Sequence, residues 1–240
     1  MSERKLNINN ELLAALLNEY FTPDVNITTD WQKVACAIAA TKGFSVITGG
    51  PGTGKTTTVT KLLAILQSLY KTAPLSIKLV APTGKAAARL SESILGAKDK
   101  LTNIPADIKT LIPESAQTIH RLLGVKPFTN KFRHNKANPL HLDVLIIDEA
   151  SMVDLSLMAK LIEALPAHAR LILLGDKDQL ASVDTGSVMS DLCQGLVLGQ
   201  TPGYSPARCD ELNNLCFNGE AKLIAQSNSA FKLADCIAFL

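Results

Sequence analysis

The sequence predicts an α/β domain with a mainly parallel sheet and helices on both of its faces. Short apolar runs recur along the 240 residues, and segments with helical periodicity separate them. The runs are continuous rather than alternating, which is typical of strands that helices bury on both sides. They lie at residues 45–48, 76–81, 142–147, 171–174 and 236–240.

Composition limits the class of protein. Hydrophobic residues make up 47% of the chain and charged residues 19%, which suits one large α/β domain. The net charge of +2 excludes a uniformly basic protein, so any nucleic-acid contact must come from a local patch. The apolar runs are too short to cross a bilayer. Five cysteines without a C-x-x-C pair, and no signal peptide in residues 1–10, lead us to expect a cytoplasmic protein.

A helix is expected near the N-terminus, because leucines recur at helical spacing over residues 11–21. We expect residues 1–28 to form this helix and a linker. Residues 29–240 are then expected to form the main α/β domain, since every longer apolar run lies within them.

A second helix is predicted over residues 29–41, with Thr28 or Thr29 as its N-cap. Gln32 lies near its start, shortly before a glycine-rich loop. A glutamine amide is able to accept from adenine N6 and donate to N7, the geometry that also reads adenine in DNA. Taken alone, Gln32 would be an ordinary surface residue. Beside a phosphate-binding loop, we expect it to bind adenine.

The loop after the first apolar run has the strongest functional signal. Residues 49–56 read Gly-Gly-Pro-Gly-Thr-Gly-Lys-Thr, the G-x-x-x-x-G-K-[ST] pattern between a strand and a helix. In this pattern backbone N–H groups surround phosphate oxygens, the lysine reaches the β- and γ-phosphates, and the hydroxyl binds Mg²⁺. We therefore expect ATP and Mg²⁺ as ligands, Lys55 as a catalytic residue and Thr56 as a metal ligand. The expected nucleotide-binding residues of the loop are Gly49, Gly50, Pro51, Gly52, Thr53, Gly54, Lys55, Thr56 and Thr57.

The second apolar run leads into a segment with two equally supported interpretations. It ends in Ala-Pro-Thr-Gly-Lys at residues 81–85, where the threonine is a suitable N-cap for an alanine-rich helix. The hydroxyl, the lysine and the helix N-terminus would together hold a nucleic-acid phosphate. Close packing of small residues explains the same pattern. The candidate DNA-binding residues of this segment are Pro82, Thr83, Gly84 and Lys85.

Signals are weaker between the second and third apolar runs. Residues 97–113 look irregular and exposed, whereas residues 116–124 indicate a short capped helix. Thr118 and His120 in that helix are candidates for contacts to a sugar–phosphate chain, although a single histidine is more often structural. Residues 125–141 indicate an exposed loop or hairpin with cations around two phenylalanines, a pattern that binds single strands by charge and stacking. A solvated hairpin is nearly as well supported.

Two acidic residues follow the third apolar run. Asp148 and Glu149 come at the end of an aliphatic strand, which is the second half of a phosphate-loop nucleotidase site. We expect Asp148 to hold Mg²⁺ and Glu149 to deprotonate the attacking water. After the fourth run, Gln179 is expected to act in catalysis by sensing the γ-phosphate. Beyond it, residues 193–234 look polar and irregular, with one short helix near residues 220–226.

Together these motifs resemble those of superfamily-1 DNA helicases and, more narrowly, of the RecD family. The resemblance covers residues 29–240 and implies the first of two RecA-like motor domains. It further implies ATP-driven 5′→3′ movement on single-stranded DNA, within an exodeoxyribonuclease V that also contains RecB- and RecC-like subunits and acts in double-strand break repair. The matching segments are Gln32 and residues 49–56, 81–87, 117–124, 147–152 and 175–180.

Two parts of the RecD pattern find no match in these 240 residues. They are the amino-terminal domain and the second motor domain, whose arginines complete the ATP site in related motors. We therefore expect a single motor domain that hydrolyses ATP barely above background. The alternatives are a nucleotide-gated DNA-binding module without turnover, a P-loop ATPase unrelated to nucleic acid, and a stand-alone RecD-like helicase.

Overall fold

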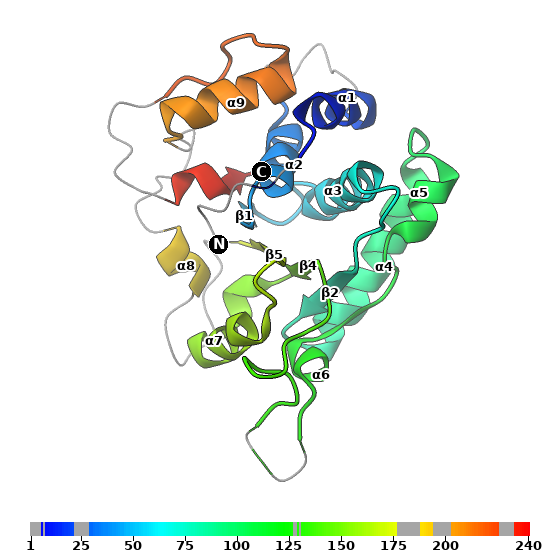
Figure 1. Ribbon diagram of the computed structural model, residues 1–240, viewed down its shortest axis with the longest axis vertical. Coiled ribbons are helices and arrows are strands. Elements are labelled where there is room, and N and C mark those ends of the chain that lie inside the picture. Colours follow the sequence, from blue (N-terminus) through cyan, green and yellow to red (C-terminus); the bar gives the residue numbers. More distant parts are fainter. Residues whose placement is uncertain are drawn as a thin grey trace.

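The computed structural model describes residues 6, 8–21, 29–126, 129, 131–176, 188–193, 203–225 and 233–240. Within them, a sheet of six parallel strands has the spatial order β3-β2-β4-β5-β1-β6 (Figure 1). The strands are β1 Phe44–Thr48, β2 Ile77–Ala81, β3 Ala116–Thr118, β4 Val144–Ile147, β5 Arg170–Gly175 and β6 Ile237–Phe239.

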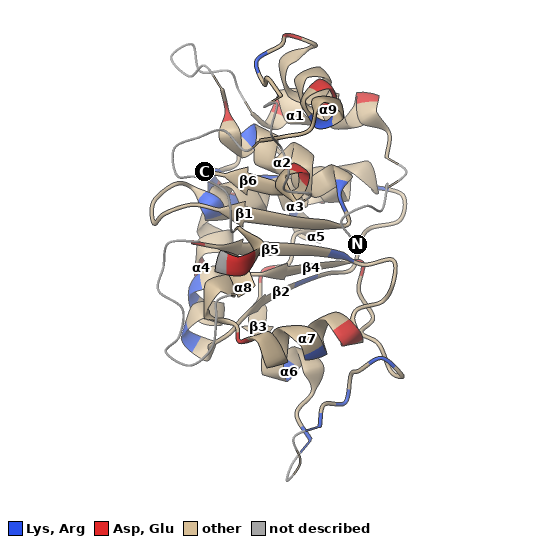
Figure 2. Ribbon diagram, turned by 90° about the vertical axis from the view of Figure 1, so that its left-hand side faces the viewer, with Lys and Arg blue, Asp and Glu red and all other residues tan. Residues whose placement is uncertain are grey.

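Helices cover both faces of this sheet, as Figures 1 and 2 show. One face carries α1 Asn10–Tyr20, α2 Trp31–Thr41, α3 Lys55–Leu69, α4 Gly84–Lys100, α5 Ala106–Leu111 and α9 Pro206–Phe217. The other face carries α6 Ile119–Leu123, α7 Leu155–Ala164 and α8 Val188–Leu192. Two 3₁₀ turns complete the elements, η1 Ala150–Met152 and η2 Ala234–Cys236.

The continuous apolar runs are explained by burial on both sides. In β4, Val144 and Ile146 belong to the core beneath α2 and α3, whereas Leu145 and Ile147 belong to the core beneath α7. Successive strand residues point to opposite faces, so a strand covered on both sides needs apolar residues at every position. The predicted α/β fold with a parallel sheet and helices on both faces is confirmed.

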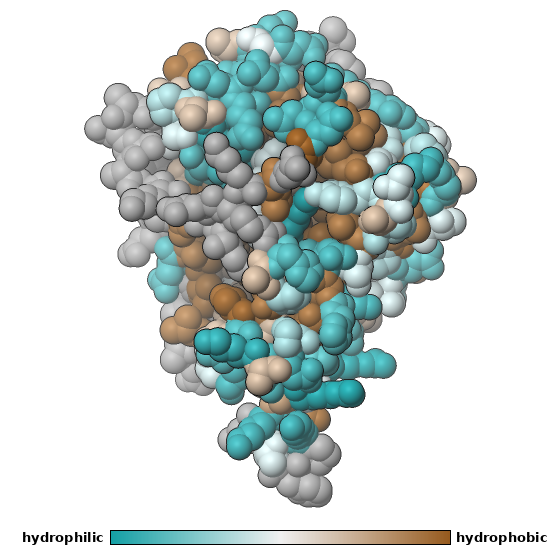
Figure 3. Space-filling model, in the orientation of Figure 1, coloured by the Kyte–Doolittle hydropathy of each residue, from teal (hydrophilic) through white to brown (hydrophobic). Residues whose placement is uncertain are grey.

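Most of the exposed surface in Figure 3 is hydrophilic, but apolar side chains gather near α7. Met152, Leu155 and Ile162 are exposed there to 43%, 65% and 47%. Within the part of the chain that the structure describes, no helix is both long and apolar enough to cross a membrane.

The strand order brings the predicted motifs to one edge of the sheet. β4, β5 and β1 are consecutive neighbours, and the loops that follow their carboxyl ends carry the acidic pair, Asp176 and the glycine-rich loop. β2 and β3 are also neighbours, with Ala81 opposite Thr118 at their carboxyl ends. In open parallel sheets, ligands bind outside the carboxyl ends of the strands.

Two local predictions were wrong between β2 and β3. Residues 97–113 are not irregular, because α4 continues to Lys100 and α5 follows it. Nor are they uniformly exposed, since Ile104, Ile108 and Ile112 are buried in the core. The short helix predicted over residues 116–124 begins only at Ile119, because the preceding three residues form β3.

Two further predictions on helix position need correction. α2 begins at Trp31, and its N-cap is Asp30, whose Oδ1 accepts from Lys33 N at 3.0 Å. Aspartate caps a helix as well as the threonine that was predicted there. The prediction of a capping side chain before α2 was therefore right, but the capping residue is Asp30. Residues 220–225 are not helical. The helix of this region is α9, which Ser205 caps and Pro206 begins.

Candidate active site

The phosphate loop between β1 and α3 has a backbone that only glycines permit at three positions. Gly52 and Gly54 have φ of +84° and +85°, a left-handed conformation that favours glycine. A Cβ atom on Gly49 would lie 2.8 Å from the Leu240 backbone oxygen and equally close to Thr53 Oγ1. The end of β6 therefore packs directly against the loop.

The Lys55 ammonium lies inside the curve of the loop. Its Nζ donates to the carbonyl oxygens of Gly49 and Gly50 at 2.5 and 2.8 Å. Thr56, the next residue of α3, is half-buried beside it, and Thr57 is exposed. The helix thus starts with a cation and a hydroxyl at the loop, where its own N–H groups also favour anions.

Gln32 is brought to the same loop by α2. Its Nε2 donates to the Thr53 carbonyl oxygen at 3.2 Å. A Cβ atom on Gly54 would approach Gln32 Nε2 to 2.4 Å, so the glutamine amide and the loop backbone are in close contact. The structure therefore places Gln32 at the edge of the predicted phosphate site.

A cavity of about 200 Å³ lies between the phosphate loop and the ends of β4 and β5. Residues from four separate parts of the chain meet around it. Its lining residues are Pro51, Lys55, Thr56, Leu90, Asp148, Glu149, Ser151, Leu174, Gly175 and Asp176.

The environment of Asp148 suits a cation. Burial raises the pKa of this carboxyl, and the neighbouring Glu149 carboxylate raises it further. A hydrogen bond from the Glu149 backbone N–H and the charge of Lys55 oppose these effects. A magnesium ion would favour the ionised form again. Among the described residues no three His, Cys, Asp or Glu side chains form a metal cluster. Magnesium needs only one or two carboxylates when phosphates and waters complete its shell, so Asp148 and Thr56 fit this ion.

Glu149 has an unusual backbone. Its φ of +51° and ψ of +40° are in the left-handed region, which a residue with a Cβ rarely adopts. Such a conformation costs about 1–3 kcal/mol and is concentrated at functional sites. Here it lets β4 end and turn into η1 while the Glu149 side chain lines the cavity.

Five lining residues were not among the site residues expected from the sequence, namely Leu90, Ser151, Leu174, Gly175 and Asp176. The last three end β5 and begin the loop after it. Ser151 comes two positions after Glu149, and this nearness to the acidic pair was the only feature of the sequence that indicated a place in the site. Leu90 of α4 reaches the cavity through packing of distant elements, and no local pattern marks it. Gln179 lies outside the described residues, and so do its neighbours at 177–180.

Two candidate DNA-binding threonines are helix caps. Thr83 Oγ1 accepts from Ala86 N at 3.1 Å at the start of α4, and Thr118 Oγ1 accepts from Arg121 N at 3.2 Å at the start of α6. Thr83 comes two residues after the end of β2, and Thr118 is the last residue of the adjacent strand β3. The structure therefore brings the two segments together at one edge of the sheet.

The other candidates lie on the surface near these caps. Gly84, Lys85 and His120 are exposed, and Pro82 is half-buried. The His120 ring centroid lies 5.9 Å from that of Phe132, which belongs to the segment after α6.

The cationic segment after α6 folds back on itself, as the hairpin prediction requires. Val125 and Phe132 form an antiparallel bridge, and Figure 2 shows the lysines and arginines spread along this extension. Phe132 lies under the Lys160 ammonium of α7, 5.6 Å from ring centroid to Nζ. Phe132 and Lys160 border a hollow of about 330 Å³. Its other lining residues are Lys126, Lys131, His134, Asn135 and Glu163.

Comparisons with known proteins agree with this geometry. A family model described as an AAA domain matches residues 32–185. The RecBCD enzyme subunit RecD of Haemophilus influenzae is 54% identical over 238 residues, which cover 92% of this chain and 37% of that protein. RecD of Mycolicibacterium smegmatis is 50% identical over 170 residues, covering 69% and 30%. The ATP-dependent RecD2 DNA helicase of Deinococcus radiodurans is 42% identical over 149 residues, covering 62% and 18%.

The fold, the phosphate loop and the acidic pair define a RecA-like P-loop domain, and the chain belongs to the AAA domain family. Its particular similarity is to RecD, so the resemblance predicted from the motifs is confirmed. The chain spans about a third of the length of these RecD relatives.

Proposed function

We propose that residues 29–240 are the first motor domain of an ATP-driven DNA helicase of the RecBCD type, moving 5′→3′ along single-stranded DNA. The observation that carries this proposal is the single cavity shared by the phosphate loop, Asp148 and Glu149. The relatives whose names are RecD subunit and RecD2 DNA helicase support the DNA-motor part.

Each residue expected to act on the nucleotide has a role in this proposal. The loop N–H groups and Lys55 bind the β- and γ-phosphates, and Gln32 binds adenine. Thr56 and Asp148 hold Mg²⁺, which neutralises phosphate charge when it is bound. Glu149 accepts the proton of the attacking water, and Gln179 senses the γ-phosphate.

Lys55→Ala is expected to weaken binding of magnesium ATP about 10- to 100-fold, because it removes charge-assisted hydrogen bonds to phosphate oxygens. The fold should survive, since both hydrogen bonds of the Lys55 ammonium within the described residues go to carbonyl oxygens of the loop. Calorimetric titration measures both affinities. Lys71→Ala is the matched control, because this exposed lysine lies beyond the far end of α3 and pairs with Asp107. Equal affinities for the two variants would refute the assignment of the loop.

We further propose that DNA phosphates bind at the ends of β2 and β3, over Pro82, Thr83, Gly84, Lys85, Thr118 and His120. Thr83 and Thr118 leave oxygen lone pairs and hydroxyl hydrogens available beyond their capping bonds. The N-terminus of α4 adds N–H groups that favour an anion.

Lys85→Ala is expected to weaken single-strand binding for every sequence and to lower the slope of log affinity against log salt by about 0.7. Fluorescence anisotropy at several salt concentrations measures this slope. Lys100→Ala is the control, since this exposed lysine is at the opposite end of α4. A slope that Lys85→Ala leaves unchanged would mean that Lys85 contacts no DNA phosphate.

We also propose that the protein works in the cytoplasm with RecB- and RecC-like subunits. Cys36, Cys209 and Cys216 are buried free thiols, which suits a reducing compartment.

DNA-stimulated ATP turnover in a protein of full RecD length would distinguish a DNA motor from the alternative functions. Binding without turnover would favour a nucleotide-gated module, and no effect of DNA would favour an unrelated ATPase.

A further inference from the structure

A buried lysine joins three helices behind the nucleotide cavity. Lys33 of α2 is only 8% exposed. Its Nζ donates to Asn18 Oδ1 of α1 at 2.7 Å and to the Cys216 carbonyl oxygen of α9 at 2.8 Å. Burial lowers the pKa of this lysine, so its position is costly for a cation unless these acceptors are present. Lys33 therefore fixes the first turn of α2 to α1 and α9.

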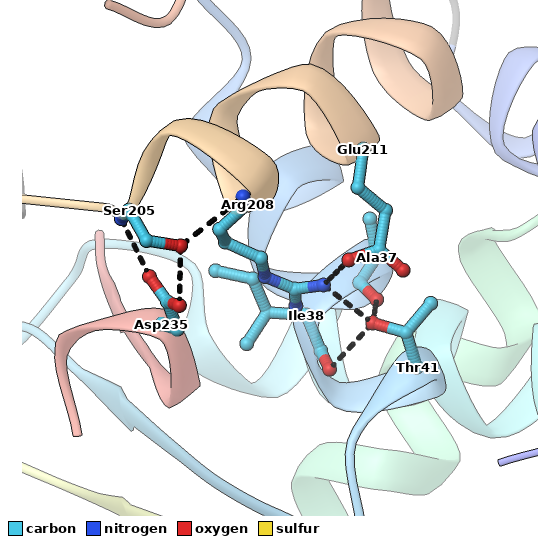
Figure 4. A network of polar contacts seen from close by, with 7 residues as sticks. All are labelled: Ala37, Ile38, Thr41, Ser205, Arg208, Glu211 and Asp235. Carbon is cyan, nitrogen blue, oxygen red and sulfur yellow. Dashed lines mark hydrogen bonds and ion pairs between the residues drawn. The ribbon is translucent and has the colours of Figure 1, made fainter. Parts of the chain in front are cut away.

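The opposite end of α2 is held by the same partner helix. Arg208, near the start of α9, is 2% exposed, and its Nη1 donates to Thr41 Oγ1 at 3.0 Å. Figure 4 shows this guanidinium over the last turn of α2, with Glu211 pairing with the same nitrogen. α9 thus contacts α2 at both ends, through Lys33 at the first turn and through Arg208 at the last.

α9 is itself anchored to the sheet. Ser205 Oγ caps it by accepting from Arg208 N at 3.2 Å, and the same hydroxyl bonds Asp235 Oδ2 at 2.7 Å just before β6 (Figure 4). Tyr204 OH donates to the Ile237 carbonyl oxygen of β6 at 3.0 Å. α9, which holds both ends of α2, is therefore attached to β6, the strand next to β1.

The residue beside Lys33 is the one in contact with the phosphate loop. Gln32 Nε2 is 3.2 Å from the Thr53 oxygen and so close to Gly54 that a Cβ there would have no room. The contact between Gln32 and the loop depends on the position of the first turn of α2, because any shift of this turn would move the Gln32 amide as well. The position of the Gln32 amide therefore depends on the first turn of α2, which Lys33 ties to α1 and α9.

We propose that Lys33 is a positioning residue for base recognition: by tying the first turn of α2 to α1 and α9, it holds the Gln32 amide where it reads adenine. The inference rests on the proposed adenine role of Gln32. It adds that the preference for adenine over guanine depends on the docking of α1, a helix that contributes no residue to the cavity lining.

The test is the ratio of affinities for ADP and GDP, measured by calorimetry with magnesium on the 240-residue chain. Lys33→Met keeps the length and burial of the side chain but leaves Asn18 Oδ1 and the Cys216 carbonyl without their donor. We expect the ADP:GDP ratio to fall about fivefold, the effect of losing about one net hydrogen bond at the base. Affinity for inorganic pyrophosphate, which contacts only the loop, should stay unchanged.

Gln67→Met is the matched control for lost stability. Gln67 is also buried, and its side chain makes three hydrogen bonds, to Leu75 N, Leu75 O and Leu111 O, away from α2. This variant should lower the melting temperature and leave the ADP:GDP ratio unchanged. If Lys33→Met fails to fold, Asn18→Ala serves instead, because it removes one acceptor from an exposed residue and should lower the ratio in the same direction.

A double-mutant cycle separates this inference from the proposed function. Gln32→Ala should lower the ADP:GDP ratio, and Lys33→Met should lower it no further in that background. If the chain bound neither nucleotide, the proposed nucleotide site would be wrong. If it bound both and Gln32→Ala left the ratio unchanged, the adenine role of Gln32 would be wrong, and this inference would fall with it. If Gln32→Ala lowered the ratio while Lys33→Met and Asn18→Ala did not, Lys33 would be a purely structural residue and the inference would be overturned.

Discussion

Residues 1–240 alone are expected to bind ATP but to hydrolyse it about 10³- to 10⁵-fold more slowly than a protein of full RecD length. This factor is the rate increase that an added arginine contributes in phosphate-loop enzymes, about 10³- to 10⁵-fold. Phosphoryl transfer builds negative charge on the γ-phosphate oxygens. Lys55 is the cation among the residues that line the cavity. Arg208 does not supply this charge, because it is buried against Thr41 and Glu211.

The measurement is ATP turnover with and without single-stranded DNA, for the 240-residue chain and for a longer chain that includes the downstream region of its relatives. Lys55→Ala in each chain gives the background from contaminating enzymes. DNA-stimulated turnover in the short chain at the rate of the long one would refute a mechanism that needs a second motor domain.

Glu149→Gln in a protein of full RecD length is expected to slow single-turnover hydrolysis about 10²- to 10⁴-fold, the usual contribution of a general base. The amide keeps the shape of the side chain but has no charge to accept the proton. Affinity for magnesium ATP should stay close to that of the unchanged protein, because the loop and Lys55 are intact.

Rapid-quench measurements with radiolabelled ATP give this rate directly. Glu163→Gln is the control, since Glu163 is an exposed carboxylate on α7 outside the active-site cavity. A single-turnover rate that does not change would assign the proton transfer to another group.

The parts of the site predicted from sequence are those in which chemistry and local geometry come from adjacent residues. The loop from Gly49 to Thr56 contains its own turn residues, its cation and its hydroxyl, and a strand and a helix flank it. Asp148 and Glu149 directly follow a recognisable strand. The fold class was predictable for a related reason, because strands buried on both faces must be apolar at every position.

The errors come from elements whose form depends on distant contacts. α9 was not predicted because its buried face includes Arg208 and Asn213, residue types that usually lie on the surface. In the structure, Arg208 bonds Thr41 and Asn213 bonds the backbone of Leu223, both far away in sequence or beyond the helix. β3 has only three residues and forms because β2 lies beside it. The left-handed backbone of Glu149 and the link from Lys33 to Cys216 have no local signal at all.

The strand order also has a consequence for synthesis on the ribosome. β1, which leads into the phosphate loop, pairs within the described residues with β5 and β6, both formed by much later parts of the chain. At elongation rates of about 5–20 residues per second, β1 waits roughly ten seconds for β5 to be made. Loop closure over such a separation is slow compared with local folding. The nucleotide pocket therefore assembles only after β5 has been made, long after the phosphate loop itself, because the end of β5 forms part of the cavity lining.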